Sequence, residues 1–123
     1  MAQRKRVAFV VDDETIIAKT LAVILSTVGF SAIAFDDPTE ALTAASITNP
    51  DLLITDVMMP KMTGIQLAVL FRNAYPECRV LLFSGHISTG DLLAQAKADG
   101  HDFEILAKPV HPTELLAKLR ESE

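Results

Sequence analysis

The chain has 123 residues, of which half are hydrophobic and 22% are charged, and this is the length and balance of one soluble globular domain. Eleven lysine and arginine residues stand against 16 aspartate and glutamate residues, which leaves a net charge of -5. That balance lacks the basic field that non-specific nucleic-acid binding needs, so we expect no nucleic-acid partner and instead an acidic site that binds a cation.

Three features of the sequence predict a cytoplasmic protein without a membrane partner. The longest uncharged stretch, residues 20–35, has sixteen residues, which is short of the ~20 apolar residues of a spanning helix. The apolar run after the basic residues 4–6 is ended at once by an acidic turn, unlike the core of a signal peptide. The single cysteine, Cys78, excludes an internal disulfide and fits a reducing cytosol, where we expect it to pack in the core.

The first half of the chain predicts two strands and two helices. Residues 7–11 form a continuous apolar run rich in β-branched residues, which is typical of a strand buried on both faces. Apolar residues then recur at helical spacing until Gly29, which is a stop signal. These are Ile17, Leu21, Ile24 and Val28. Residues 30–35 are a second predicted strand, and residues 37–46 begin with a cap residue, a proline and a glutamate placed to complete a capping box.

The second half continues the same alternation. The predicted strands are residues 51–56, 79–83 and 103–107. The predicted helices are residues 65–73, residues 91–98 and a last helix that starts at the pattern of residues 111–114 and runs through Leu119. Five strands that alternate with five helices require parallel pairing and right-handed crossovers. We therefore predict an α/β fold with an open, five-stranded parallel sheet and helices on both faces.

In such a sheet, ligands bind beyond the carboxyl ends of the strands. The first predicted strand ends in Asp12 and Asp13, the third in Asp56, the fourth in Ser84 and the fifth in Lys108. Three carboxylates repel one another unless a cation lies among them, so the cluster predicts a hard, oxygen-preferring metal such as Mg²⁺. A metal, an ammonium group and a hydroxyl around a carboxylate are the groups that stabilise a transferring phosphoryl group, and the carboxylate itself can be the nucleophile.

Four ordered motifs resemble the receiver domains of bacterial two-component response regulators, including the chemotaxis receivers. They are Val10-Val11-Asp12-Asp13-Glu14, Asp56-Val57-Met58-Met59-Pro60-Lys61-Met62-Thr63-Gly64, Phe83-Ser84-Gly85 and Lys108-Pro109. The resemblance covers residues 7–119. It implies a flavodoxin-like, doubly wound sheet with the strand order 2-1-3-4-5 and five helices.

The resemblance also implies a role for each acidic residue of the motifs. Asp56 is the expected phosphoacceptor. Asp13 and Asp56 are expected to bind Mg²⁺ together with the backbone carbonyl of Met58, and Asp12 to act on the ion mainly through water. These positions are the expected metal site of the chain.

The hydroxyl and lysine motifs are expected to contact the phosphoryl group through Ser84 and Lys108. The family also implies a cis peptide between Lys108 and Pro109, although only about 5% of such bonds are cis. The family often has threonine where Ser84 stands, and it usually has an aromatic residue where Ile105 stands. The nearest aromatic, Phe103, lies on the same strand face as Ile105 by parity. We expect either residue to serve in the switch, or the coupling to differ.

The implied function is two-component signal transduction by Mg²⁺-dependent phosphorylation of Asp56, donated in a phosphorelay by a histidine kinase or a histidine phosphotransfer protein. Since Glu123 closely follows the last predicted helix, we expect residues 1–123 to be a single receiver domain with no output domain in this chain. The output is then protein binding through the surface of helix 4, strand 5 and helix 5, by a monomer or weak dimer. We expect no enzymatic activity beyond self-catalysed phosphoryl transfer and autodephosphorylation.

Three other functions remain as alternatives. A degenerate receiver would bind partners without accepting a phosphoryl group, although all five site residues are present. A phosphohydrolase of the haloacid dehalogenase type also uses an aspartyl nucleophile, but it has Asp-x-Asp after the first strand, where this chain has Asp12-Asp13-Glu14. A flavodoxin-like cofactor binder needs backbone donors after that strand, and an acidic turn there repels a flavin phosphate.

Overall fold

The computed structural model describes residues 5–85, 89–109 and 111–120. Strands and helices alternate along these ranges. They are β1 (Val7–Val11), α1 (Thr15–Ser26), β2 (Ser31–Phe35), α2 (Pro38–Ile47), β3 (Leu52–Asp56), α3 (Gly64–Ala74), β4 (Arg79–Ser84), α4 (Thr89–Ala98), β5 (Glu104–Ala107) and α5 (Pro112–Arg120). The strands form one parallel sheet in the order β2-β1-β3-β4-β5, which confirms the predicted architecture.

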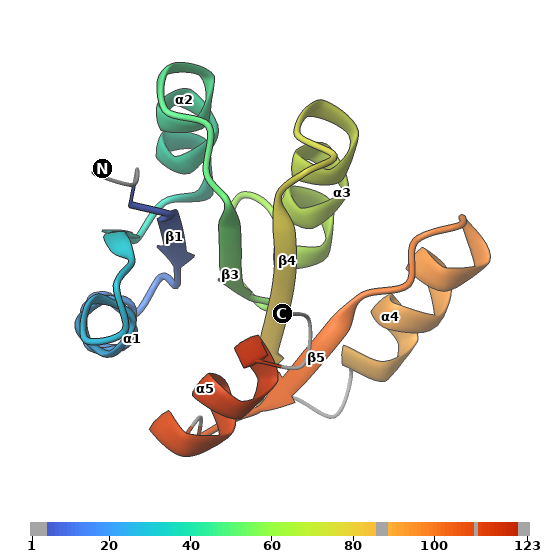
Figure 1. Cartoon of the computed structure of the whole chain (residues 1–123). Coiled ribbons are helices and arrows are strands. Elements are labelled where there is room, and N and C mark those ends of the chain that lie inside the picture. Colours follow the sequence, from blue (N-terminus) through green and yellow to red (C-terminus); the bar gives the residue numbers. More distant parts are fainter. Residues whose placement is uncertain (1–4, 86–88, 110, 121–123) are drawn as a thin grey trace.

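The helices cover the sheet on two sides (Figure 1). Side chains of α1 and α5 pack on one face, where Leu25 and Leu115 are fully buried. Side chains of α2, α3 and α4 pack on the other face, around Phe9 and Phe71. The central strand β3 is buried along its whole length because helices cover both of its faces, as expected for a parallel sheet. This buried strand carries Asp56 at its end.

Helix α1 contacts the sheet through residues that partly match those that marked it in the sequence: Leu21 is buried, and Ile17 and Ile24 pack against the core. Its buried residues are Ala18, Leu21, Ala22 and Leu25. Val28, which the sequence pattern included, lies beyond the end of the helix and is 47% exposed. The buried face therefore consists of two alanines and two leucines, and the β-branched residues lie at its margin or in solvent. Ile16, for example, is 81% exposed.

The capping box occurs at α3 rather than at α2. Asp37 does cap α2, but it does so by accepting from the backbone N–H of Thr39 at 2.9 Å rather than in a box with Glu40. At α3, Thr63 Oγ1 accepts from the N–H of Gln66 at 3.1 Å, and Gln66 Oε1 accepts from the N–H of Thr63 at 2.9 Å. The sequence carries the signature of this box, Thr-x-x-Gln, directly before the helix.

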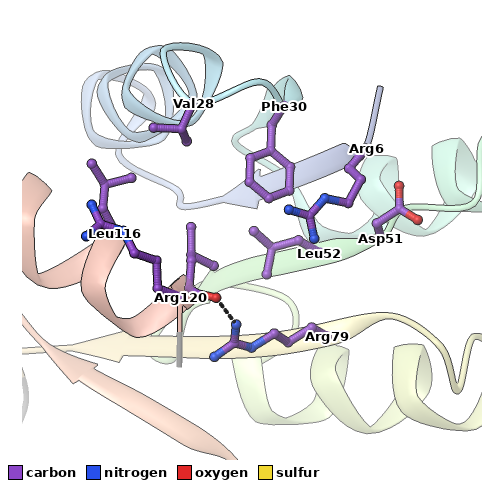
Figure 2. Close-up of a pocket in the computed structure, with 9 residues that line it drawn as sticks. Arg6, Val28, Phe30, Asp51, Leu52, Arg79, Leu116 and Arg120 are labelled. Carbon is purple, nitrogen blue, oxygen red and sulfur yellow. Dashed lines mark hydrogen bonds between the residues drawn. The ribbon is translucent and has the colours of Figure 1, made fainter. Parts of the chain in front are cut away.

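A pocket of about 200 Å³ lies at the amino ends of the strands (Figure 2), opposite the edge where Asp12, Asp13 and Asp56 lie. At its border Arg79 donates to the carbonyl oxygens of Lys118 and Leu119 at 2.7 and 2.9 Å. Its guanidinium also forms two 3.2 Å bonds with the carboxylate of Glu104. Arg79 thereby fixes the last turn of α5 and the start of β5 to the first residue of β4.

The structure bears on the predicted packing of Cys78 and on the predicted lack of a membrane-spanning helix. Cys78 packs in the same core cluster as Phe9 and Phe71, which confirms the predicted packing role, and its burial raises the pKa of the thiol to about 12. Among the described residues the longest helix, α1, has 12 residues, and no helix there meets the length and hydropathy that a bilayer span requires.

Candidate functional site

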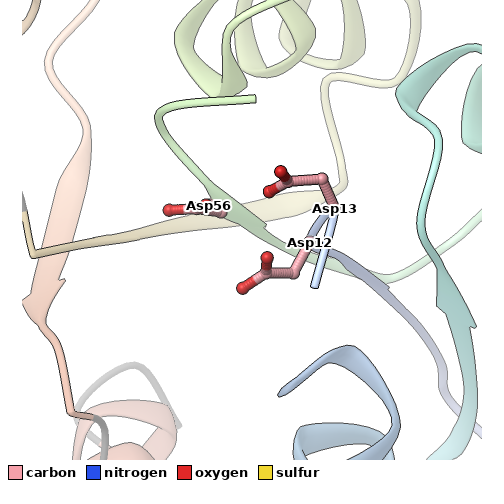
Figure 3. Close-up of side chains that lie close together, drawn as sticks. All are labelled: Asp12, Asp13 and Asp56. Atoms are coloured by element: carbon pink, nitrogen blue, oxygen red, sulfur yellow. The ribbon is translucent and has the colours of Figure 1, made fainter. Parts of the chain in front are cut away.

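The carboxyl ends of four strands bring the predicted site residues to one edge of the sheet. Asp12 and Asp13 follow β1, Asp56 ends the adjacent strand β3, Ser84 ends β4 and Lys108 follows β5. One carboxylate oxygen from each of the three aspartates lies within 4.8 Å of the other two (Figure 3). The tertiary structure therefore assembles the acidic cluster that the strand ends predicted.

The three carboxylates differ in their surroundings. Asp12 is fully buried and Asp56 is 3% exposed, whereas Asp13 is exposed. Asp12 Oδ1 accepts from the N–H of Glu14 at 2.8 Å. Burial raises the pKa of both Asp12 and Asp56, and each is raised further by another carboxylate of the cluster. Two buried carboxylates at this separation favour binding of a cation.

The donor set of the cluster suits a hard divalent metal. Within the described part of the chain, Asp56 Oδ1 is the buried side-chain oxygen that has no hydrogen-bond donor. It lies beside two further carboxylates, and Mg²⁺ in proteins is held by one or two carboxylates, carbonyl oxygens and water. A cation bound among these carboxylates would give Asp56 Oδ1 the partner that it lacks.

Lys108 approaches the same carboxylates from the β5 side. Its Nζ lies 3.2 Å from Asp12 Oδ2 and 3.4 Å from Asp56 Oδ1. Partial burial lowers the pKa of Lys108, but the charges of Asp56 and Asp12 outweigh this effect and the net pKa is raised. The ammonium therefore stays protonated. The peptide bond between Lys108 and Pro109 is cis, as predicted, and the N–H of Lys108 donates to the carbonyl of Ser84 at 3.0 Å.

The loop that follows Asp56 returns to the strand it leaves. The N–H of Gly64 donates to the carbonyl of Val57 at 2.8 Å, which closes the loop that contains Met58. A Cβ atom at residue 64 would lie 1.9 Å from the backbone oxygen of Asp56, so only glycine fits at this position. Gly64 is the last residue of the second motif, but its close approach to the backbone of Asp56 has no local signal in the sequence.

The two candidates for the switch residue have different environments. Ile105 is in register with Leu82, and Leu82 shares a core cluster with Phe103, so both candidates lie on the α3–α4 side of the sheet, as parity predicted. Phe103 is 8% exposed and lies beneath the guanidinium of Arg72, 4.2 Å from the ring centre. Ile105 is 38% exposed. Phe103 is thus held in the core, whereas Ile105 is available on the surface of β5.

The doubly wound sheet, the acidic cluster and the lysine at its carboxyl edge define a class of signalling domain that accepts a phosphoryl group on aspartate. Residues 8–120 match the response regulator receiver domain, and the chain belongs to this family. It is a receiver domain of two-component signal transduction. The family match supports neither the degenerate receiver nor the phosphohydrolase better than it supports a phosphorylated receiver domain.

The proteins that are similar in sequence are longer than this chain. The DNA-binding response regulator MtrA of Mycobacterium tuberculosis is 32% identical over 117 residues, which are 95% of this chain and 50% of that protein. The response regulator MprA of Mycobacterium avium is 32% identical over 111 residues, or 90% of this chain and 48% of that protein. The chain spans about half the length of the curated relatives it matches.

The relatives in structure confirm the flavodoxin-like fold. The signal receiver domain of an HD domain-containing protein from Pseudomonas fluorescens superposes with a TM-score of 0.86 and 28% identity over 99% of this chain and 89% of that one. The chemotaxis response regulator CheY4 of Vibrio cholerae superposes with a TM-score of 0.82 and 28% identity, and the match covers 98% of this chain and 100% of that one.

Proposed function

We propose that Asp56 is the residue that accepts the phosphoryl group, and that Ser84 and Lys108 contact that group once it is bound. The observation that carries this proposal is the environment of Asp56: it is nearly buried, and its orphan oxygen lies 3.4 Å from a protonated lysine. A phosphoryl group on Asp56 would bring negatively charged oxygens beside that ammonium, which would then pair with them.

Asp12, Asp13, Asp56 and the backbone carbonyl of Met58 would hold Mg²⁺ in this proposal. When bound, the ion neutralises the charge that gathers on the phosphoryl oxygens and the attacking carboxylate. The role of Asp12 fits its contacts, because one of its oxygens is taken by Glu14 and the other by Lys108. It therefore has less capacity for direct ligation than Asp13, which is exposed.

The proposed reaction is phosphoryl transfer from a phosphohistidine. A carboxylate oxygen of Asp56 forms a bond to phosphorus as the bond from phosphorus to the imidazole nitrogen of the donor breaks. The nitrogen retains the bonding electron pair and takes up a proton from solvent. Attack by water on the same phosphorus later restores the carboxylate, so the chain would act only in its own phosphorylation and autodephosphorylation.

The proposed donor is a histidine kinase or a histidine phosphotransfer protein, and the proposed output is protein binding at the surface of α4, β5 and α5. The exposed Ile105 on β5 and the fixing of α5 by Arg79 support this surface. We further propose that residues 1–123 are a single receiver domain that works in the cytoplasm as a monomer or weak dimer. Glu123 lies outside the described residues.

Acetyl phosphate, a small phosphodonor, tests the proposal without knowledge of the kinase. With Mg²⁺ present, we expect the intact mass to rise by one phosphoryl group, and with EDTA we expect no change. Absence of a mass gain in a folded protein, without release of phosphate, would instead support a degenerate receiver. Sustained release of phosphate without a mass gain would support a phosphohydrolase.

Replacement of Lys108 by alanine is expected to preserve the fold, Mg²⁺ binding and phosphorylation but to uncouple phosphorylation from the output surface. The reason is that the remaining carboxylates still bind the ion, whereas the variant has no ammonium group to pair with the phosphoryl oxygens. Hydrogen exchange of β5 and α5, measured with and without acetyl phosphate and Mg²⁺, should change in the wild type and stay constant in the variant. Lys97→Ala on α4 is the matched control, and an equal change in the Lys108 variant would contradict this role.

A further inference from the structure

An ion pair joins the loop after Asp56 to the start of α2. Lys61 Nζ lies 2.6 Å from Asp37 Oδ2. The other oxygen of Asp37 accepts from the N–H and the hydroxyl of Thr39 at 2.9 and 2.7 Å. The hydrogen bonds from Lys61 and Thr39 lower the pKa of Asp37 to about 2. Asp37 is therefore charged at neutral pH, and it holds the loop with one oxygen and the helix with the other.

The backbone at Lys61 is unusual. Its φ angle is 71°, and within the described residues it is the non-glycine residue with positive φ. L-residues rarely adopt this left-handed conformation, and such residues persist where surrounding contacts determine them. The N–H of Met62 donates to the carbonyl of Pro60 at 2.7 Å, so the chain turns tightly around Lys61. Asparagine or glycine would adopt this backbone more readily than lysine, which points to a role for the lysine side chain.

The ion pair spans the strand that carries two of the proposed metal ligands. Lys61 follows β3 and Asp37 follows β2, and β1 lies between these strands in the sheet. The neighbouring Asp36 accepts from the hydroxyl of Thr15, which follows the acidic turn, at 3.2 Å. The turn between β2 and α2 thus contacts the loop after β3 through Asp37 and the first residue of α1 through Asp36.

We infer that the Lys61–Asp37 pair is a tether that positions the loop containing the Met58 carbonyl and thereby strengthens Mg²⁺ binding. The inference rests on the proposed metal site. Lys61 is a positioning residue, because it contacts Asp37 and acts on the metal site only through the loop. The tether is modest in strength because Lys61 is 63% exposed, although Asp37 is only 19% exposed.

The tether and simple electrostatics predict opposite results when the lysine charge is removed. An acidic site that loses a nearby positive charge attracts a divalent cation more strongly. A purely electrostatic effect would therefore tighten Mg²⁺ binding. Loss of the tether frees the loop and weakens binding instead. The direction of the change in the dissociation constant therefore separates the two explanations.

Titration calorimetry with Mg²⁺ on the full chain tests the tether. Lys61→Asn and Lys61→Gly suit the left-handed backbone but lack the cation, and we expect their dissociation constants to rise by about 1.5- to 5-fold. Lys61→Arg keeps the cation and should stay within the error of the wild type. Lys19→Asn, an exposed charge on α1, is the control for net charge and should leave the constant unchanged or lower it.

Binding by Lys61→Asn and Lys61→Gly that equals or exceeds that of the wild type would overturn the tether while leaving the proposed metal site intact. Weak binding by Lys61→Arg, equal to that of Lys61→Asn, would also overturn it, because the cation would then have no role. A wild-type chain that fails to bind Mg²⁺ would overturn the proposed metal site itself. Melting curves in EDTA, expected to agree among all variants within a few degrees, exclude a general loss of stability.

Discussion

Asp56→Asn is expected to abolish incorporation of the phosphoryl group from acetyl phosphate. The amide has nearly the shape of the carboxylate but lacks the anionic oxygen that attacks phosphorus. Since Asp56 is 3% exposed in the sheet edge, the near-isosteric change should leave the fold in place. Intact mass after incubation with acetyl phosphate and Mg²⁺ gives the result directly.

The same substitution is expected to stabilise the fold at neutral pH. Burial raises the pKa of Asp12 and Asp56, so their charged forms are less favourable in the folded than in the unfolded chain. Their contribution to stability is full below the unfolded pKa of about 4 and is lost as the pH rises through the higher folded pKa. Asparagine removes one charge, and Lys108 keeps Asp12 as its partner at 3.2 Å.

We expect the melting temperature of Asp56→Asn at pH 7 to exceed that of the wild type by about 3 to 8 °C without metal, and the difference to vanish below about pH 4. Asp102→Asn, at an exposed position, is the control and should change neither phosphorylation nor the melting temperature. Phosphorylation of Asp56→Asn at the wild-type rate would contradict the assignment of the acceptor. A lower melting temperature at pH 7 would contradict the electrostatic account of the cluster.

Gly64→Ala is expected to lower the stability of the fold more than Gly85→Ala, the other glycine-to-alanine change at the site. The new Cβ would lie 1.9 Å from the carbonyl oxygen and 2.8 Å from the carbonyl carbon of Asp56, and backbone atoms cannot rotate away as a side chain does. Alanine favours a helix over glycine by up to about 1 kcal/mol, so the clash must exceed this gain. We expect a net loss of about 2 to 4 kcal/mol.

Denaturant unfolding and Mg²⁺ titration check this prediction together. The displaced backbone belongs to Asp56 itself, so we expect weaker Mg²⁺ binding as well as lower stability. Gly85→Ala is the matched control, because its Cβ would meet the side chain of Lys108 at an ordinary distance of 3.4 Å. A Gly64→Ala variant as stable as the wild type would show that the loop after β3 can shift without cost.

Much of the fold could be predicted from local patterns. The run at residues 7–11 and the Asp37-Pro38 helix start both produced the elements that the structure contains. The site residues were also predictable, because strands of a parallel sheet place their carboxyl ends at one edge and chain order alone assigns Asp12, Asp56 and Lys108 to them. The Thr63–Gln66 capping box was equally local in the sequence but was missed.

Other features depend on contacts between distant segments and carry no local signal. Phe103 and Ile105 have the same parity along the strand. Phe103 is nevertheless buried beneath Arg72, whereas Ile105 is exposed on the edge strand β5. The requirement for glycine at residue 64 arises from the carbonyl of Asp56, and the partner of Lys61 is 24 residues away. None of these pairings follows from hydrophobic periodicity or turn residues.

The amino-acid sequence by itself determined the βα alternation, the parallel sheet and the identity of the residues at its carboxyl edge, because these follow from side-chain periodicity and chain order. Only the tertiary structure decided the burial of Asp12 and Asp56, the distances from Lys108 to both, and the attachment of Lys61 to Asp37. The physical reason is that desolvation and ion pairing depend on distances between segments far apart in the chain, and packing of the whole domain sets these distances.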